Sequence, residues 1–246
     1  MTRRVLVTGA SSGIGAATAR ALAAAGLQVL GTARRADRLE KLAKETGIDW
    51  VAADLSTDEG IETLVNYAAK GDPITAVVNN AGGALGTDPV AEGDVAEWRR
   101  MYEINVISTL RVTQAFLPYI REHGGDLVFI SSTAGHNTYP GGAGYVAAKH
   151  AERQIPNALR LELVGEPVRV IDISPGMVHT EEFSLVRYHG DQAAADQVYA
   201  GVDHPLVAED IAEAVRWALM LPEHVNIDSM VIRPRAQASN TLVARN

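Results

Sequence analysis

The sequence contains no cysteine. This absence excludes disulfide bonds, a thiolate nucleophile and metal or iron–sulfur sites that depend on cysteine ligands. Long hydrophobic runs are also missing, since no stretch approaches the roughly 18 apolar residues of a membrane-spanning helix. The apolar run at 5–7 stops at Thr8 and Gly9, too early for a signal peptide. We therefore expect a cytoplasmic protein that has no membrane partner.

Aromatic residues and positive charge are scarce. Aromatics make up 5% of the 246 residues, so the core must be built from Ala, Val, Leu and Ile, which suits a sheet covered by closely packed helices. The formal net charge of −8 argues against a nucleic-acid partner, because binding phosphates along a duplex requires clustered Lys and Arg. Histidines and carboxylates show no spacing typical of metal ligands, and we expect no metal site.

Short β-branched runs alternate with helical patterns along the chain. The runs predict strands at 4–8, 28–32, 49–53, 75–79, 127–131, 169–174 and 229–233, and the patterns predict helices at 14–25, 37–46, 58–70, 95–122, 145–164 and 208–221. This alternation predicts an α/β fold: a single Rossmann-type, doubly wound domain of about seven parallel strands with helices on both faces. No repeat or linker interrupts the pattern, so we expect residues 1–246 to form one dinucleotide-binding catalytic domain.

The least regular stretch is 180–205, which is polar and has weak apolar stripes. A long insertion at the carboxyl end of a strand is well placed to cover a ligand, and we expect this segment to cover a substrate. A tolerated surface loop is the alternative. Pro156 falls within the 145–164 pattern and is expected to kink that helix, because proline removes a helical hydrogen bond.

A glycine-rich turn joins the first predicted strand to the first predicted helix. Gly9 allows a sharp turn, while Gly13 and Gly15 remove side chains where backbone must approach a pyrophosphate and where the helix must lie against the sheet. The amino terminus of the helix then offers free N–H groups to a phosphate. We therefore expect a dinucleotide at this turn, in contact also with Ser11, Ser12 and Ile14.

The end of the second strand indicates which dinucleotide is bound. An NAD-binding fold places a carboxylate there to bond the adenosine ribose, whereas this chain has Arg34 and Arg35. A planar guanidinium can bond two oxygens of the 2′-phosphate of NADP. The sequence therefore predicts NADP. Alternatively these arginines are the solvated start of the next helix, which is the more plausible reading for Arg35 than for Arg34.

Three further features fall at places that meet at one edge of a parallel sheet. Asn79–Gly82 end the fourth predicted strand, Ser131 and Ser132 end the fifth, and Tyr145 and Lys149 lie four residues apart at the start of a helix. Residues at that spacing share a helical face. Because strand carboxyl ends line the ligand crevice of such a sheet, all of these side chains are expected at one site.

In this order, the motifs resemble those of the short-chain dehydrogenase/reductase family over essentially the full length of the chain. The resemblance extends to Asn105 and to Pro175–Gly176 after the sixth predicted strand. Segments 32–39, 182–188 and 221–227 are similar to those of NADP-dependent 3-hydroxy acid (serine) dehydrogenases, enzymes like malonic semialdehyde reductase. The chain departs from that pattern at His179–Glu181, within the expected substrate-covering segment.

The chemistry gives these residues roles. Free tyrosine has a pKa of about 10, and a neighbouring Lys149 ammonium and an oxidised nicotinamide should each lower the pKa of Tyr145, so that it can take the hydroxyl proton of an alcohol. Ser132 is suited to hold the substrate oxygen. The resemblance implies that Lys149 also bonds the nicotinamide ribose and that Asn105 holds a water linking Lys149 to solvent. It also implies further cofactor contacts: Asp54, Leu55, Asn80, Ala81, Gly82, Pro175, Gly176, Val178 and Thr180.

The predicted reaction is NADP-dependent interconversion of a small alcohol, such as the 3-hydroxy acids serine or 3-hydroxypropionate, and its carbonyl compound. Arg187 is the nearest unassigned cation for a substrate carboxylate, although a surface arginine is an equal alternative. Two other readings remain open: a general carbonyl or ketone reductase of the same fold, and a non-catalytic NADP-binding regulatory protein. The resemblance further suggests a homotetramer.

Overall fold

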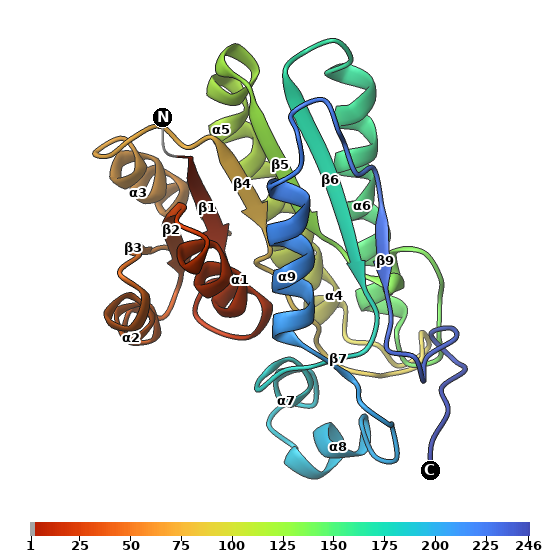
Figure 1. Ribbon diagram of the computed structural model, residues 1–246. Helices are drawn as coiled ribbons and strands as arrows, with labels where there is room; N and C mark the ends of the chain where they lie inside the picture. The colour runs from red at the N-terminus through yellow and green to blue at the C-terminus, as the bar shows by residue number, and fades with distance from the viewer. Residues whose placement is uncertain (1–2) are drawn as a thin grey trace.

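A computed structural model of the chain describes residues 3–246, and its centre is one sheet of seven parallel strands (Figure 1). The sheet order is β3-β2-β1-β4-β5-β6-β9. Its strands are β1 (Arg4–Thr8), β2 (Gln28–Ala33), β3 (Asp49–Ala52), β4 (Ala76–Asn79), β5 (Gly125–Ile130), β6 (Val168–Pro175) and β9 (Met230–Ile232). The prediction of a doubly wound α/β fold with seven parallel strands is confirmed.

Helices cover both faces of the sheet (Figure 1). One face packs against α1 (Gly13–Ala24), α2 (Ala36–Thr46) and α9 (Ala208–Leu219). The opposite face packs against α3 (Asp58–Ala68), α5 (Ser108–His123) and α6 (Ala143–Glu162). Successive residues of β1 serve the two layers in turn, because side chains of a strand alternate: Val5 and Val7 lie in the first layer and Leu6 in the second.

The predicted helix at 95–122 is three helical segments. α4 (Val95–Tyr102) leads into a π-helical segment, Glu103–Ile107, and α5 follows without a break. A π turn inserts one extra residue into a helix. The apolar residues stay close to helical spacing across this junction, so the sequence pattern does not reveal the insertion. The inserted turn carries Asn105.

The segment 180–205 is also more regular than its sequence suggests. It contains α7 (Phe183–Arg187) and α8 (Gln192–Gln197), which lie beyond the carboxyl ends of the strands (Figure 1). A short parallel pair, β7 (Val178–His179) with β8 (Leu206–Val207), connects the two ends of the segment. These helices are too short for a periodic pattern to be read from the sequence. The helix α6 continues through Pro156 to Glu162.

The order of the strands reverses between β1 and β4, which are neighbours in the sheet. In doubly wound sheets, ligands bind in the crevice outside the strand ends at such a switch point. Within residues 3–246, no helix is both long enough and apolar enough to span a membrane.

Candidate active site

A cleft of about 1080 Å³ runs along the carboxyl ends of the strands. Nearly all of the predicted site residues line it: Gly9, Ser11, Ser12, Gly13, Ile14, Arg34, Arg35, Asp54, Leu55, Asn80, Ala81, Gly82, Ser132, Tyr145, Lys149, Pro175, Gly176, Val178, Thr180 and Arg187. Two predicted residues, Gly15 and Asn105, lie behind this lining. The topology therefore brings together residues from eight separate stretches of the chain.

Hydrogen bonds connect Thr8, at the start of the glycine turn, to the residues that directly follow β4. Thr8 Oγ1 accepts hydrogen bonds from the backbone N–H groups of Asn80 and Ala81, both at 2.9 Å, and Asn80 Nδ2 donates to the carbonyl of Thr8 at 2.9 Å. Gly9 has φ +68°, a conformation that favours glycine. A Cβ on Gly15 would lie 2.3 Å from the Gly9 carbonyl oxygen, so the first turn of α1 can pack this closely only with glycine at position 15.

The amino terminus of α1 opens on the cleft. Ser12 is its N-cap residue, and the side chain of Ser12 accepts no capping bond within the described residues. The first N–H groups of the helix thus remain available to an anion. Thr180 lies over Gly13, where an added Cβ would come within 3.5 Å of the threonine side chain. These residues fit the pyrophosphate of a dinucleotide.

Arginine residues beside this turn are paired with two acidic residues that directly precede α7, Glu181 and Glu182. Arg35 donates to both carboxylate oxygens of Glu182, at 2.5 and 2.7 Å, and also to Ser11 and Ser12 Oγ at 3.0 and 3.1 Å. Hydrogen bonding from Arg35 lowers the pKa of Glu182 to about 2. Arg34 is exposed at the cleft wall. The importance of Glu182 was missed, because nothing in the sequence pairs position 182 with position 35.

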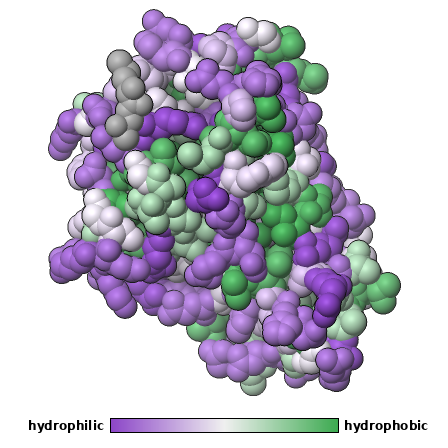
Figure 2. Space-filling model, in the orientation of Figure 1, coloured by the Kyte–Doolittle hydropathy of each residue, from purple (hydrophilic) through white to green (hydrophobic). Residues whose placement is uncertain are grey.

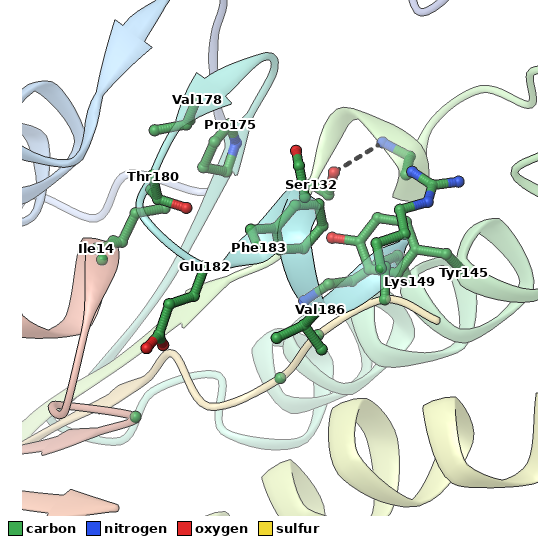
Figure 3. Close-up of a pocket in the computed structure, with 18 of the residues that line it drawn as sticks. Ile14, Ser132, Tyr145, Lys149, Pro175, Val178, Thr180, Glu182, Phe183 and Val186 are labelled. Atoms are coloured by element: carbon green, nitrogen blue, oxygen red, sulfur yellow. Dashed lines mark hydrogen bonds between the residues drawn. The ribbon is translucent and has the colours of Figure 1, made fainter. Parts of the chain in front are cut away.

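Tyr145 and Lys149 lie on one face of α6 and are both buried, with the Lys149 ammonium 6.0 Å from the centre of the Tyr145 ring (Figure 3). Lys149 donates to the Ile130 carbonyl at 3.2 Å. Burial raises the pKa of Tyr145 above its ordinary value, while the charge of Lys149 and a hydrogen bond with Ser132 act in the opposite direction. Lys149 thus lowers the pKa of Tyr145, as predicted. Burial raises that pKa by more, because desolvation penalises the charged phenolate.

The two serines at the end of β5 have different surroundings. Ser131 is buried and donates to Asp172 of β6, with Ser174 Oγ at 2.7 Å. Ser132 is half-buried, accepts one bond from the Ala134 N–H at 3.1 Å, and lies near Tyr145 in the cleft (Figure 3). Ser132 is therefore the less buried of the two serines and faces the cleft, and its role in holding a ligand stays a prediction.

Asn105 is fully buried in the π-helical segment. Its amide donates to the carbonyls of Gly83 and Met101 at 2.9 and 2.7 Å, and its Oδ1 accepts from the Gly83 N–H at 3.1 Å. The side chain thus fixes the loop after β4, next to Gly82. The role predicted for Asn105 in holding a water stays a prediction.

Glu152 is a second residue that the sequence reasoning missed. It lies one turn beyond Lys149 on α6, and its Oε2 is 2.5 Å from Lys149 Nζ. Burial raises the pKa of Glu152 to about 7, against the opposing effect of the Lys149 charge. A signal was present, because residues three apart share a helical face.

Arg187 lies beside the catalytic tyrosine candidate. Its guanidinium donates to the Gly86 carbonyl, the Tyr139 hydroxyl and the Gly141 carbonyl, at 3.2, 3.0 and 2.9 Å. The same guanidinium is 5.9 Å from the centre of the Tyr145 ring. Phe183, also on α7, makes an edge contact with that ring, with centroids 5.7 Å apart. Two side chains of α7 thus lie beside the Tyr145 ring, and the covering of a substrate by segment 180–205 stays a prediction.

A doubly wound sheet with a glycine turn at its switch point, and with a buried Tyr–Lys pair facing Ser132, defines a Rossmann-type nucleotide-binding oxidoreductase. Comparison with known proteins specifies the family. Residues 3–188 match the family described as short chain dehydrogenase, and the chain belongs to it. The predicted family, fold and enzyme class are confirmed.

Three known proteins illustrate the similarity. An uncharacterized oxidoreductase of Mycobacterium tuberculosis is 51% identical over 238 residues, which cover 96% of this chain and 93% of that protein. A serine 3-dehydrogenase of Agrobacterium fabrum is 41% identical over 241 residues, covering 97% and 96%. A solved structure, the closed form of serine dehydrogenase complexed with NADP+, superposes with a TM-score of 0.92 at 37% identity, covering 99% of each chain.

Proposed function

We propose that this oxidoreductase interconverts a small 3-hydroxy acid, such as serine or 3-hydroxypropionate, and its carbonyl compound, with NADP as the cofactor. The position of Arg187 carries the proposal. Three of the five N–H donors of its guanidinium have partners in the described chain, which leaves two for a ligand next to Tyr145. A carboxylate bound by this fork would lie beside the reacting carbon of a short substrate.

The cofactor prediction, NADP, agrees with the serine dehydrogenase structure that contains NADP+. In this chain the turn at Gly9–Gly15 and the amino terminus of α1 would hold the pyrophosphate. Arg34 and Arg35 would hold the 2′-phosphate, since the carboxylate that NAD prefers is missing there. When bound, the nicotinamide supplies or accepts the hydride.

The chain's own residues then carry the proton. In carbonyl reduction, Tyr145 donates its phenolic proton to the substrate oxygen, and Ser132 holds that oxygen by a hydrogen bond as negative charge develops on it. In alcohol oxidation the phenolate of Tyr145 takes the proton back. Lys149 stabilises the phenolate electrostatically, and Asn105 fixes the loop next to it. Segment 180–205 covers the substrate and excludes water through Phe183.

A substrate panel tests this function. Purified protein is assayed with NADPH and NADH against serine, 3-hydroxypropionate, their carbonyl forms and neutral ketones, by nicotinamide absorbance. We expect faster turnover with NADP(H) and with the acidic substrates. Turnover confined to neutral ketones would overturn the 3-hydroxy acid assignment, and faster turnover with NADH would overturn the assignment of the arginine pair.

A general carbonyl reductase is the second candidate, and one observation favours it. The lining of the cleft also includes apolar side chains from α7, namely Phe183, Leu185 and Val186. These suit a bulky neutral substrate. The ketone arm of the panel separates the two candidates.

We also propose a homotetramer. Large apolar side chains are exposed at the carboxyl end of α6, just after that helix, and on β9: Leu161, Val164 and Val231 have 80%, 83% and 42% of their surfaces exposed. Figure 2 shows apolar side chains gathered beside α9, over β9. Exposed apolar patches of this kind favour association. Light scattering of the purified protein measures the assembly, and a monomer at micromolar concentration would contradict it.

A further inference from the structure

Glu152 and Lys149 form a buried ion pair on α6. Their charged atoms are 2.5 Å apart, and the two side chains are 1% and 5% exposed. A buried carboxylate is costly unless a charge compensates it. Within the described chain, the ion partner of Glu152 is the same ammonium that faces Tyr145. The site therefore contains three coupled titratable groups rather than two.

The other charged and titratable groups around this trio come from four elements. They are Tyr139 before α6, Arg153 on α6, Asp172 on β6, Arg187 on α7 and His136 after β5. Asp172 already accepts from Ser131 and forms an ion pair with Arg153 at 3.3 Å. Among the residues that the structure describes, Glu152 has no such second cation, so its charge acts mainly on Lys149.

Glu152 raises the pKa of both neighbouring groups, Lys149 and Tyr145. Burial, the largest single cause, lowers the pKa of Lys149, but the charge and hydrogen bond of Glu152, together with smaller effects of Tyr145 and Asp172, leave that pKa above its ordinary value. The same negative charge adds to the effect of burial in raising the pKa of Tyr145. Both shifts favour the protonated forms.

We propose that Glu152 is a positioning residue that keeps the Tyr145–Lys149 pair fully protonated and so prepares Tyr145 to act as a proton donor in carbonyl reduction. This inference rests on the proposed function, because it assumes that Tyr145 donates the proton. It extends that function because Glu152, a side chain that does not touch the substrate, would maintain the protonated state of Tyr145 and Lys149.

The electrostatic interaction of Glu152 with Tyr145 and Lys149 fixes the direction in which the apparent pKa of the pair should move. When the negative charge at position 152 is removed, the pair loses its first proton at lower pH, whichever of Tyr145 and Lys149 releases it. The two groups titrate together, so the measured quantity is the apparent pKa of the pair. A neutral isostere at position 152 isolates the charge from the packing.

The first experiment is a pH profile of kcat/KM for carbonyl reduction, with saturating NADPH, on wild type and Glu152→Gln. We expect the alkaline limb of the variant to move to lower pH by about one unit or more, as removal of a nearby charge in a buried site requires. A merely structural role would reduce activity at every pH without moving the limb. An unmoved limb, or one moved to higher pH, overturns the proposal.

A second experiment needs no substrate. The phenolate absorbance of Tyr145 is titrated as the difference between each protein and its own Tyr145→Phe variant, in the wild-type and Glu152→Gln backgrounds. We expect the difference titration to begin at lower pH in the Glu152→Gln background, and coincident titrations overturn the proposal. If wild type turns over no carbonyl substrate, the proposed function fails, while this titration still decides the role of Glu152.

Control variants separate charge from structure. Glu152→Asp keeps the charge and should largely restore the wild-type profile. Glu213→Gln removes the carboxylate of a surface pair with the same i, i+3 spacing, Glu213–Arg216, and should leave the profile unchanged. If Glu152→Gln does not fold, Glu152→Met supplies a neutral side chain of similar length, and the same two outcomes apply.

Discussion

Arg35 and Glu182 are 147 positions apart in the sequence, yet the guanidinium of the first donates to both carboxylate oxygens of the second. Arg35 also contacts Ser11 and Ser12 at the glycine turn. The pair thus connects the proposed 2′-phosphate site to the segment that covers the substrate. A phosphate entering this site meets a carboxylate that competes for the same guanidinium and repels the incoming charge.

Glu182→Gln is therefore expected to bind NADPH about three- to tenfold more tightly, because the competing charge is gone. Binding is measured by fluorescence titration with NADPH and with NADH. NADH lacks the phosphate and should bind as it does to wild type. The matched control is Glu181→Gln, which removes an exposed partner of Arg38 and should have a smaller effect. Weaker NADPH binding in Glu182→Gln would contradict the competition.

The same pair makes stability depend on pH. The pKa of Glu182 is lowered to about 2 in the folded protein, below the ordinary carboxylate value of about 4.3. A depressed carboxylate pKa contributes stability above the unfolded value, and this contribution is lost as pH falls toward 2. We expect Glu182→Gln to have a lower Tm than wild type at pH 6, with a difference that shrinks toward pH 2. A constant difference would show that the charge is not the cause.

Arg34→Ala tests the choice of cofactor. We expect the KM for NADPH to rise about tenfold or more, since a charge-assisted contact to phosphate is lost, while the KM for NADH stays the same. Initial rates with each cofactor provide the measurement. A matched Arg99→Ala substitution on α4, away from the cleft lining, should change neither KM. Equal losses with both cofactors would remove Arg34 from the phosphate site.

Arg187→Ala tests recognition of the substrate carboxylate. We expect the KM for a 3-hydroxy acid to rise about tenfold or more, while that for a small neutral ketone changes little. Arg187→Lys keeps the charge but not the planar fork, and should recover only part of the loss. Parallel kinetics on both substrates measure the effect. Equal losses on acid and ketone would mean that Arg187 serves only to hold Tyr139 and the loop at Gly141.

Tyr145→Phe tests the proton donor. We expect kcat for carbonyl reduction to fall by about 10² to 10⁴, the usual contribution of general acid catalysis, while NADPH binding stays within about twofold. Stopped-flow measurement of nicotinamide oxidation gives the rate, and fluorescence titration gives the binding. Retained turnover would assign the proton transfer to another group.

The parallel sheet, the glycine turn and most of the residues that line the cleft could be predicted from the sequence alone, because these depend on local patterns. Buried β-branched runs form strands, and strand ends meet at one edge of a parallel sheet. The four-residue spacing of Tyr145 and Lys149 likewise fixes a shared helical face before any folding is considered. The local sequence does not show which of the titratable groups on that face are charged.

The tertiary structure sets the protonation states of these groups. Burial, which no pattern reports, raises the pKa of Tyr145 against the effect of Lys149 and makes Glu152 depend on the same ammonium. Folding also placed Glu182 against Arg35, since only the chain's path across the sheet brings residues so distant together. Local sequence specifies which groups are present, whereas desolvation and long-range pairing, which arise only on packing, set their protonation and their partners.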